Sequence, residues 1–287
     1  MAAILKHELR TYFNSLTAYV FGAFLLLAVG LGAMLYNIQA SVSNFEFALS
    51  YFSIIFVVIV PILTMRVIAE ERKQKTDQLL YSLPITTTQV VVGKYLALLA
   101  VYLVPLALVC LYPLIFSRYG DVYLLTSYGS ILAFFVMGAA LIALGVFISS
   151  LTDSQSFAAG VGVAVILFNY YSVSLSEYVS STALGSMIAI GVFIIALGAV
   201  VRQLTKNDGL ALGAAAVLLL GTGAAYYAAP EKFEGLLPKI MSELSLFERF
   251  YVFVNGVFDL TGIVYYMTLI VFFLFLSVQS MEKRRYN

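Results

Sequence analysis

The stretch MRVIAEERKQKTDQLLYSLPITTTQVVVGK, residues Met65–Lys94, is the longest polar interruption on the basic side of a very apolar chain. Seven charged residues fall between Arg66 and Asp77. One apolar run leads into the stretch from Tyr51, and another leads out of it from Tyr95. A charged segment between two such runs predicts a surface loop that joins two membrane spans.

The composition of the 287-residue chain is that of a membrane protein. Apolar residues make up 62 % of it and charged residues 11 %, with a mean hydropathy of +0.98. Soluble domains carry ~25 % charged residues. We therefore expect an all-α, polytopic helical membrane protein embedded in the lipid bilayer. The net charge of +1 gives no reason to expect nucleic acid as a partner.

Eight apolar runs predict membrane-spanning helices, as a six-helix core plus one further pair. Their expected limits are Ala18–Tyr36, Ala48–Met65, Tyr95–Phe116, Ser127–Ser149, Phe157–Ser174, Ala183–Val201, Leu210–Ala229 and Gly262–Ser280. The further pair is residues 183–229, and the basic loop inside it favours two full crossings. The alternative is a re-entrant hairpin, which leaves six spans.

The distribution of basic residues over the connections predicts the orientation of the chain. With the N-terminus inside, 12 of the 16 Lys and Arg residues lie on the inner side of the membrane. The reverse orientation leaves only four of them there. Both termini are therefore expected to be cytoplasmic, which requires an even number of spans.

Two segments outside the spans have the pattern of interfacial helices. In Met1–Ser15 apolar residues recur at helical spacing among basic ones, as in a helix that lies in the headgroup plane. A frayed cytoplasmic tail is the alternative. Residues 230–261 predict external helices on the outer leaflet, with an ordinary external loop as the alternative. No internal repeat is visible, so we expect residues 1–287 to form a single transmembrane domain.

The spans contain few groups that could carry chemistry. None of them has an ionisable residue near its middle, which disfavours ion-coupled transport. The single histidine, His7, excludes a His–His metal site within one chain. The most central polar residues are neutral, and they include Asn169 and Tyr170. These two are candidates for the translocation path, and hydrogen bonding between helices is the alternative role for Asn169.

The chain also lacks a nucleotide-binding loop. A P-loop has a glycine five residues before its Gly-Lys-Ser/Thr, whereas Gly93-Lys94 is preceded by TTTQVVV and followed by Tyr95. We therefore expect no cofactor in this chain and no ATPase activity of its own. An energy source, where one is used, has to act through a partner at the inner face.

The Met65–Lys94 stretch itself predicts a helix–turn–helix hairpin. No helix breaker occurs between Met65 and Ser82, so the second span is expected to continue into the cytoplasm until Pro84 ends it. Hydroxyls at residues 86–88 can cap the next helix, which runs on into the third span. The alternative is a solvated charged loop without defined structure.

This hairpin resembles the signature of ABC-2-type transporter permeases. The matching residues are Met65, Arg66, Ala69, Glu70, Glu71, Arg72, Thr76, Leu79, Leu80, Pro84, Gly93, Lys94 and Ala97. Two positions depart from the pattern, because Lys75 stands where the family usually has glycine and Gln78 where it often has glutamate. The segment ISSLTDSQSFAA and the C-terminal run from residue 245 are similar to the GldF-like and NosY-like branch.

The resemblance implies the transmembrane domain of a type-2 ABC exporter in the cytoplasmic membrane of a bacterium. Its partners are then cytoplasmic ABC ATPase subunits, which bind ATP and Mg, a second permease subunit as homo- or heterodimer, and a GldG-like extracytoplasmic subunit. The residues expected to couple to the ATPase are Arg66, Glu70, Glu71, Arg72, Thr76, Asp77, Pro84, Gly93 and Lys94, with Pro84 and Gly93 shaping the turn.

Three functions are compatible with the sequence to different degrees. The first is export of an amphipathic, lipidic or peptide substrate, driven by ATP hydrolysis in a separate subunit. The second is a membrane anchor or mechanotransmission subunit of an ABC complex that transports nothing. The third, a secondary carrier, is disfavoured by the missing intramembrane charges.

Overall fold

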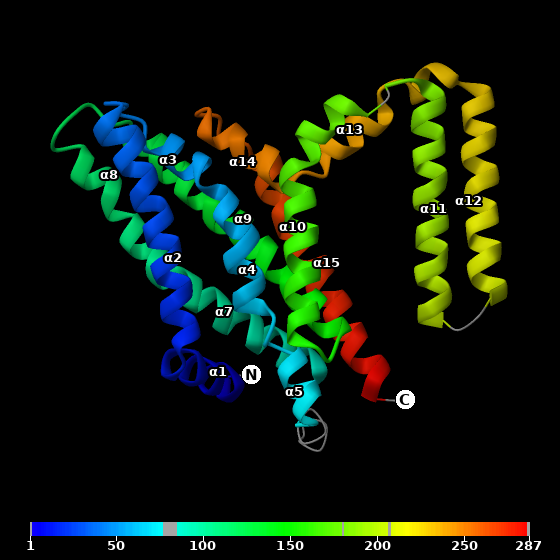
Figure 1. The fold of residues 1–287 in the computed structure, drawn as a ribbon, viewed down its shortest axis with the longest axis horizontal. Coiled ribbons are helices and arrows are strands. Elements are labelled where there is room, and N and C mark those ends of the chain that lie inside the picture. The colour runs from blue at the N-terminus through cyan, green and yellow to red at the C-terminus, as the bar shows by residue number, and fades with distance from the viewer. Residues whose placement is uncertain (1, 77–84, 180, 206–207, 286–287) are drawn as a thin grey trace. The chain divides into compact units, whose positions relative to one another are not determined.

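The computed structural model of the protein describes residues 2–76, 85–179, 181–205 and 208–285. Every regular element in these ranges is a helix, and no strand occurs in them (Figure 1). Helices suit these apolar runs because a helix satisfies its backbone polar groups internally, as a bilayer requires. The all-α prediction is confirmed.

The elements of the N-terminal half are α1 Ala2–Asn14, α2 Leu16–Gly32, the π-helical η1 Ala33–Gln39, α3 Phe45–Tyr51, the 3₁₀ turn η2 Ser53–Ile55, α4 Phe56–Thr64, α5 Ala69–Gln74, α7 Thr87–Val109 and α8 Leu111–Phe116. Those of the C-terminal half are α9 Leu124–Leu151, α10 Gln155–Tyr178, α11 Ala183–Thr205, α12 Asp208–Ala228, the 3₁₀ turn η3 Pro230–Phe233, α13 Leu236–Glu243, α14 Leu246–Val254 and α15 Leu260–Arg285.

Six helical segments among the described residues are long and apolar enough to cross a membrane. They are Leu16–Gln39, Phe45–Gln74, Thr87–Phe116, Leu124–Leu151, Gln155–Tyr178 and Leu260–Arg284. The bent pair Leu212–Ala228 and Pro230–Glu243, with 118° between its members, makes a seventh if it counts as one span. Two further full crossings by α11 and α12 stay a prediction, although both form helices where spans were expected.

The chain forms two compact units. Unit 1 comprises Met1–Tyr170 and Arg249–Asn287, and unit 2 comprises Tyr171–Glu248. In unit 1, α1, α5, the start of α7 and the end of α15 lie at one end, which we call the inner end (Figure 1). Both termini therefore lie at the same end of unit 1, as the predicted orientation requires.

Helix α9 is the central helix of unit 1, and most of its side chains are buried. It packs against α4, α7 and α15. Its glycines allow close approach, because a Cβ at Gly138 would lie 2.6 Å from the hydroxyl of Tyr102. That hydroxyl donates a hydrogen bond to the carbonyl of Phe134 on α9 at 2.9 Å. Such small-residue contacts are a common means of helix association in membranes.

The predicted continuous helix from Met65 to Ser82 is wrong in two places. The helix is interrupted by a turn at residues 65–68, between α4 and α5. It then ends at Gln74, because Lys75 adopts the left-handed conformation with φ 58°. The amides of Thr76 and Lys75 bond back to the carbonyls of Glu71 and Arg72 at 3.0 and 3.1 Å, which is the Schellman pattern of a helix end.

The second half of the predicted hairpin is confirmed. Helix α7 begins at Thr87, and the hydroxyl of Thr86 accepts a hydrogen bond from the amide of Gln89 at 3.2 Å. This N-cap bond satisfies one of the free amides of the first turn. The helix continues into the third span as expected.

Unit 2 is a helical hairpin followed by short helices. α11 and α12 pack against each other and against η3. The amide of Gly235, with φ 67°, donates to the carbonyl of Ser181 at 2.8 Å and joins the start of α13 to the segment before α11. The amphipathic α13 has no buried residue. The helices predicted between residues 230 and 261 are therefore present, and their place on the outer leaflet stays a prediction.

Candidate functional site

A groove of about 830 Å³ opens at the inner end of unit 1. Helix α1 contributes one wall, with His7 and Glu8 among its lining residues. The junction of α4 and α5 contributes the other wall, including Arg66 and Glu70. Lys94 of α7 lines the buried part between the two. The groove therefore joins the N-terminal helix to the charged segment that the sequence singles out.

Three helices meet at Lys94 through one ionic cluster. The Nζ of Lys94 lies 2.7 Å from Oε1 of Glu8 on α1 and 2.7 Å from Oε1 of Glu71 on α5. The lysine side chain is 3 % exposed, so water screens these contacts poorly. A buried ammonium is stable only when carboxylates compensate it. The cluster therefore holds α1, α5 and α7 in one relative position.

Tyr12 closes the groove from α1 beside this cluster. The side chain is buried, and this burial raises the pKa of the Tyr12 hydroxyl far above its ordinary value, with the carboxylates of Glu8, Glu71 and Glu70 adding to the effect. The hydroxyl is therefore neutral at every physiological pH. Tyr12 acts as an uncharged packing residue next to charged neighbours.

A second set of polar contacts connects α5, α9 and α15. The buried guanidinium of Arg72 donates to the carbonyl of Ser150 at the end of α9. The hydroxyl of Ser280 on α15 donates to the same carbonyl at 2.7 Å. Arg284 of α15 also forms a two-pronged ion pair with Asp153, just after α9. The hydrogen bond from Arg284 lowers the pKa of the Asp153 carboxyl below its ordinary value.

Helix α15 is also bonded to α7. The hydroxyl of Thr87, in the first turn of α7, donates to Oε1 of Glu282 at 2.7 Å. Together with the contacts of Lys94 and Arg72, this bond links α1, α5, α7, α9 and α15 into a continuous polar network at the inner end. Directional bonds therefore connect α5 to its neighbours. A displacement of α5 can be transmitted through these bonds, whereas apolar packing alone would not provide them.

The residues predicted to couple to an ATPase take different positions. Arg66 is exposed and Glu70 half-buried, whereas Arg72 and Lys94 are buried and engaged inside the chain. Thr76 takes part in the helix end of α5. Asp77 and Pro84 lie outside the described residues. The exposed surface of α5 is made by Lys73 and Gln74, with Lys75 following them.

Two further predictions concern α7 and α10. Gly93 does not shape the turn, because the Thr86 cap starts α7 at Thr87 and leaves Gly93 buried inside the helix. Asn169 and Tyr170 are both half-buried on α10. Their place on a translocation path stays a prediction.

Sequence reasoning missed several members of the network. Glu8, Asp153, Glu282 and Arg284 lie far from the hairpin in sequence, and no local pattern marks them as its partners. No signal in the sequence marks these partners, because a lysine at the start of a span ordinarily reaches the interface and needs a carboxylate only where the packed bundle buries it. The described residues contain no group of three or more His, Cys, Asp or Glu that could hold a metal ion.

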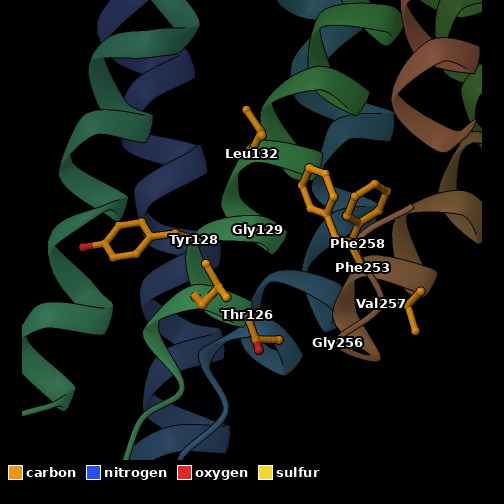
Figure 2. Close-up of a pocket in the computed structure, with 9 residues that line it drawn as sticks. Thr126, Tyr128, Gly129, Leu132, Phe253, Gly256, Val257 and Phe258 are labelled. Carbon is orange, nitrogen blue, oxygen red and sulfur yellow. The ribbon is translucent and has the colours of Figure 1, made fainter. Parts of the chain in front are cut away.

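An apolar cavity of about 490 Å³ lies at the opposite end of unit 1. Figure 2 shows Tyr128 and Leu132 of α9 on one side and Phe253 and Phe258, near the turn between α14 and α15, on the other. Gly256, with φ 82°, makes the turn that returns the chain into α15. No charged side chain lines this cavity, so it suits an apolar group and no ion.

Comparison with known proteins gives one finding for this architecture. The family model described as ABC-2 family transporter protein matches residues 33–176, half of the chain. The matched range contains α5 and Lys94, whereas α1 precedes it and α15 follows it. No curated protein and no solved structure gives a significant match.

Proposed function

The chain belongs to the ABC-2 transporter family, and on that premise we propose that a separate cytoplasmic ATPase subunit drives it by binding at the inner end. It is a multi-pass membrane protein and the transmembrane component of an ABC transporter. The proposal adds where the ATPase binds and how its motion enters the helices. Export across a bacterial cytoplasmic membrane is the expected direction.

The arrangement of α5 is the observation that supports this proposal best. Its inward side chains, Glu71 and Arg72, bond to α7 and α9, while Lys73 and Gln74 face outward. A short helix that is bonded inside and polar outside suits a reversible protein contact, because interface rims of this kind are polar. Force applied to its exposed side then reaches the helices through the inward bonds.

The surroundings of Lys94 agree with an external source of energy. A P-loop lysine reaches phosphates from a glycine-rich loop before a helix. Lys94 instead lies inside α7 and is bound by two carboxylates. This supports the proposal that hydrolysis takes place in the partner subunit, which would also hold ATP and Mg.

Site-specific crosslinking tests the location of the ATPase. Lys73→Cys, in a Cys110→Ala background, is labelled with a short cysteine-reactive photo-crosslinker after gentle purification of the complex. We expect a crosslink to a protein that hydrolyses ATP. The matched control is Lys232→Cys, an equally exposed lysine on η3 that we place on the outer side. Crosslinking from Lys232 and none from Lys73 would contradict the proposed binding site.

Charge reversal tests the coupling role of Glu70, the half-buried acid that lines the groove. Glu70→Lys changes a half-buried residue that accepts a hydrogen bond from the side chain of Gln74 at 3.3 Å. We expect this variant to keep the ATPase bound, and ATP hydrolysis by that subunit to depend less on substrate movement than in the wild-type complex. Glu71→Lys is unsuitable for this purpose, because it also disrupts the Lys94 cluster.

The substrate and the other subunits are proposed from chemistry and family likeness. The apolar outer cavity and the absence of charges from the middle of the spans favour an amphipathic, lipidic or peptide substrate. A second permease subunit and a GldG-like extracytoplasmic subunit are the expected partners. ATP-dependent movement of a labelled lipid or peptide in liposomes distinguishes an exporter from a non-transporting anchor.

A further inference from the structure

The interruption between α4 and α5 is filled by a side chain from α9. In an unbroken helix the amide of Ala69 would bond to the carbonyl of Met65. The hydroxyl of Ser149 lies between these two groups, accepting from the Ala69 amide at 3.1 Å and donating to the Met65 carbonyl at 3.3 Å. It also accepts from the amide of Ile68 at 3.2 Å.

The Ser149 hydroxyl makes all the hydrogen bonds that a serine side chain can make. A serine hydroxyl offers one donor and two acceptor positions, and here all three are engaged with the backbone around the break. Ser149 is completely buried, so water does not compete for these groups. The carbonyl belongs to the first residue of the turn at 65–68 and the two amides to its last residue and the one after it, so one side chain bonds to both ends of the interruption.

The same face of α9 contacts the end of α4. Gly145 lies one turn before Ser149, and a Cβ at Gly145 would overlap the side chain of Thr64, the last residue of α4. One turn of α9 therefore contacts the end of α4 through close packing, which permits small sliding motions, and the start of α5 through directional hydrogen bonds. Side chains inserted into the backbone ladder are a known cause of helix bends.

The next polar contact of α5 also goes to α9. Arg72 donates to the carbonyl of Ser150, the residue after Ser149. Helix α5 is thus bonded to the end of α9 at its first turn and again one turn later. Its covalent connection to α4, in contrast, runs through a turn in which the amide of Val67 makes a short-range bond to the carbonyl of Thr64 at 3.2 Å.

We propose that Ser149 is the positioning residue of a hinge at 65–68, which makes α5 move with the inner end of α9 while α4 stays behind. This inference rests on the proposed function, because it names the helix that first receives the motion of the ATPase. A hinge of a few residues at an element end is the usual place where such motions are absorbed. Bending at 65–68 then opens or closes the helix bundle between α4 and α9.

Hydrogen exchange on the chain alone, in lipid nanodiscs, tests the role of the hydroxyl. In Ser149→Ala the peptide covering residues 66–72 should exchange about tenfold faster, because two buried amides lose their acceptor. The matched control is Ser130→Ala, which removes an equally buried hydroxyl of α9 that donates to the carbonyl of Phe253. It should leave peptide 66–72 unchanged. Unchanged exchange in Ser149→Ala would overturn the proposal.

Two spin-label distances in the ATPase-bound complex test the hinge itself. Both label pairs are made in a Cys110→Ala background and share a label at Gln74. The second label is at Leu151, at the end of α9, in one pair and at Val58 on α4 in the other, and all three positions are exposed. On addition of ATP and trapping with vanadate, the 74–58 distance should change and the 74–151 distance should stay constant. In Ser149→Ala the 74–151 distribution should broaden. A 74–151 distance that changes as much as 74–58, or no change in either, overturns the hinge.

A failure of the proposed function and a failure of the proposed hinge give different experimental results. If no ATPase is crosslinked from Lys73, the proposed function fails, and the exchange of peptide 66–72 still decides whether Ser149 supports the break. If the ATPase is bound at Lys73 and the two distances behave otherwise than expected, the proposed function stands and the hinge fails.

Discussion

The two ends of unit 1 hold their helices together by different means. At the inner end, ion pairs and charged hydrogen bonds connect five helices, with Lys94 and Arg72 at the branching points. At the opposite end, aromatic packing dominates, as in the stacked rings of Phe45 and Tyr112 with centroids 5.6 Å apart. Directional bonds fix relative positions, whereas apolar contacts tolerate sliding. The contrast agrees with the proposed binding of the ATPase at the inner end.

One buried charge stands out at the apolar end. Glu46, in the first turn of α3, is fully buried, and its carboxylate accepts hydrogen bonds from Asn44 at 2.8 Å and Ser127 at 3.1 Å. Both donors are neutral, whereas each carboxylate in the Lys94 cluster faces a cation. The start of a helix is a favourable place for a carboxylate because of the helix dipole.

The largest effect is expected from breaking the inner cluster. Lys94→Met leaves the half-buried Glu8 and Glu71 together without their cation and should destabilise the chain by ~3–5 kcal/mol. Reversible unfolding in mixed micelles measures the change. The triple variant Lys94→Met, Glu8→Gln, Glu71→Gln removes all three charges and should recover most of the loss. If the unfolding free energy of Lys94→Met lies within ~1 kcal/mol of the wild-type value, the ionic cluster does not hold the helices together at the inner end.

A smaller effect is expected at the apolar end. Glu46→Ala leaves the hydroxyl of Ser127 without its acceptor and should cost ~1–3 kcal/mol. Glu46→Gln keeps an acceptor oxygen and serves as the control, with a loss well below that of the alanine variant. Because Glu46 and Lys94 are at opposite ends of unit 1, the losses of Glu46→Ala and Lys94→Met should add within ~0.5 kcal/mol. Strong non-additivity would mean that the two ends are not independent.

A gain in stability is expected at the end of α5. Lys75 has φ 58°, a conformation that costs an L-residue with a side chain ~1 kcal/mol relative to glycine. Lys75→Gly should therefore stabilise the helix end by up to about that amount, visible as slower hydrogen exchange of residues 70–76. Lys73→Gly, inside α5 and also exposed, is the control and should have the opposite sign. Destabilisation by Lys75→Gly would contradict the helix end described here.

Lys75 also shows what the sequence could and could not predict. The family pattern has glycine at this position, the residue that most readily adopts a positive φ, and the structure places a helix end there, although the helix was expected to continue to Pro84. The break at 65–68 had no such signal, because the side chain that bonds to its backbone, Ser149, is 81 residues away from Ile68. Local sequence between Met65 and Gln74 favours a continuous helix, and a tertiary contact overrides it.

The same distinction holds for the candidate site. The helical class, the Thr86 cap and the importance of the charged stretch follow from hydropathy and local side-chain chemistry. The pairing of Lys94 with Glu8 and Glu71 does not, since it depends on how α1 packs beside α5 and α7. Charge counting treated Lys94 as one of many inner-side basic residues, although it is buried. Burial of a charge is a property of the packed bundle and has no local pattern.

The smallest effect is expected where the inner network reaches water. The side chains of Arg284 and Asp153 are 43 % and 52 % exposed, so Asp153→Asn should cost no more than ~0.5 kcal/mol. The pKa of Asp153 is lowered in the folded chain, so the pair contributes fully above the ordinary aspartate pKa and is lost as the pH falls through the lowered value. Unfolding of the wild type and of Asp153→Asn should therefore differ equally at pH 5 and pH 7, and 1 M salt should reduce the difference. A difference that grows in high salt, or that equals the loss in Lys94→Met, would show that the exposed pair belongs to the rigid part of the inner end.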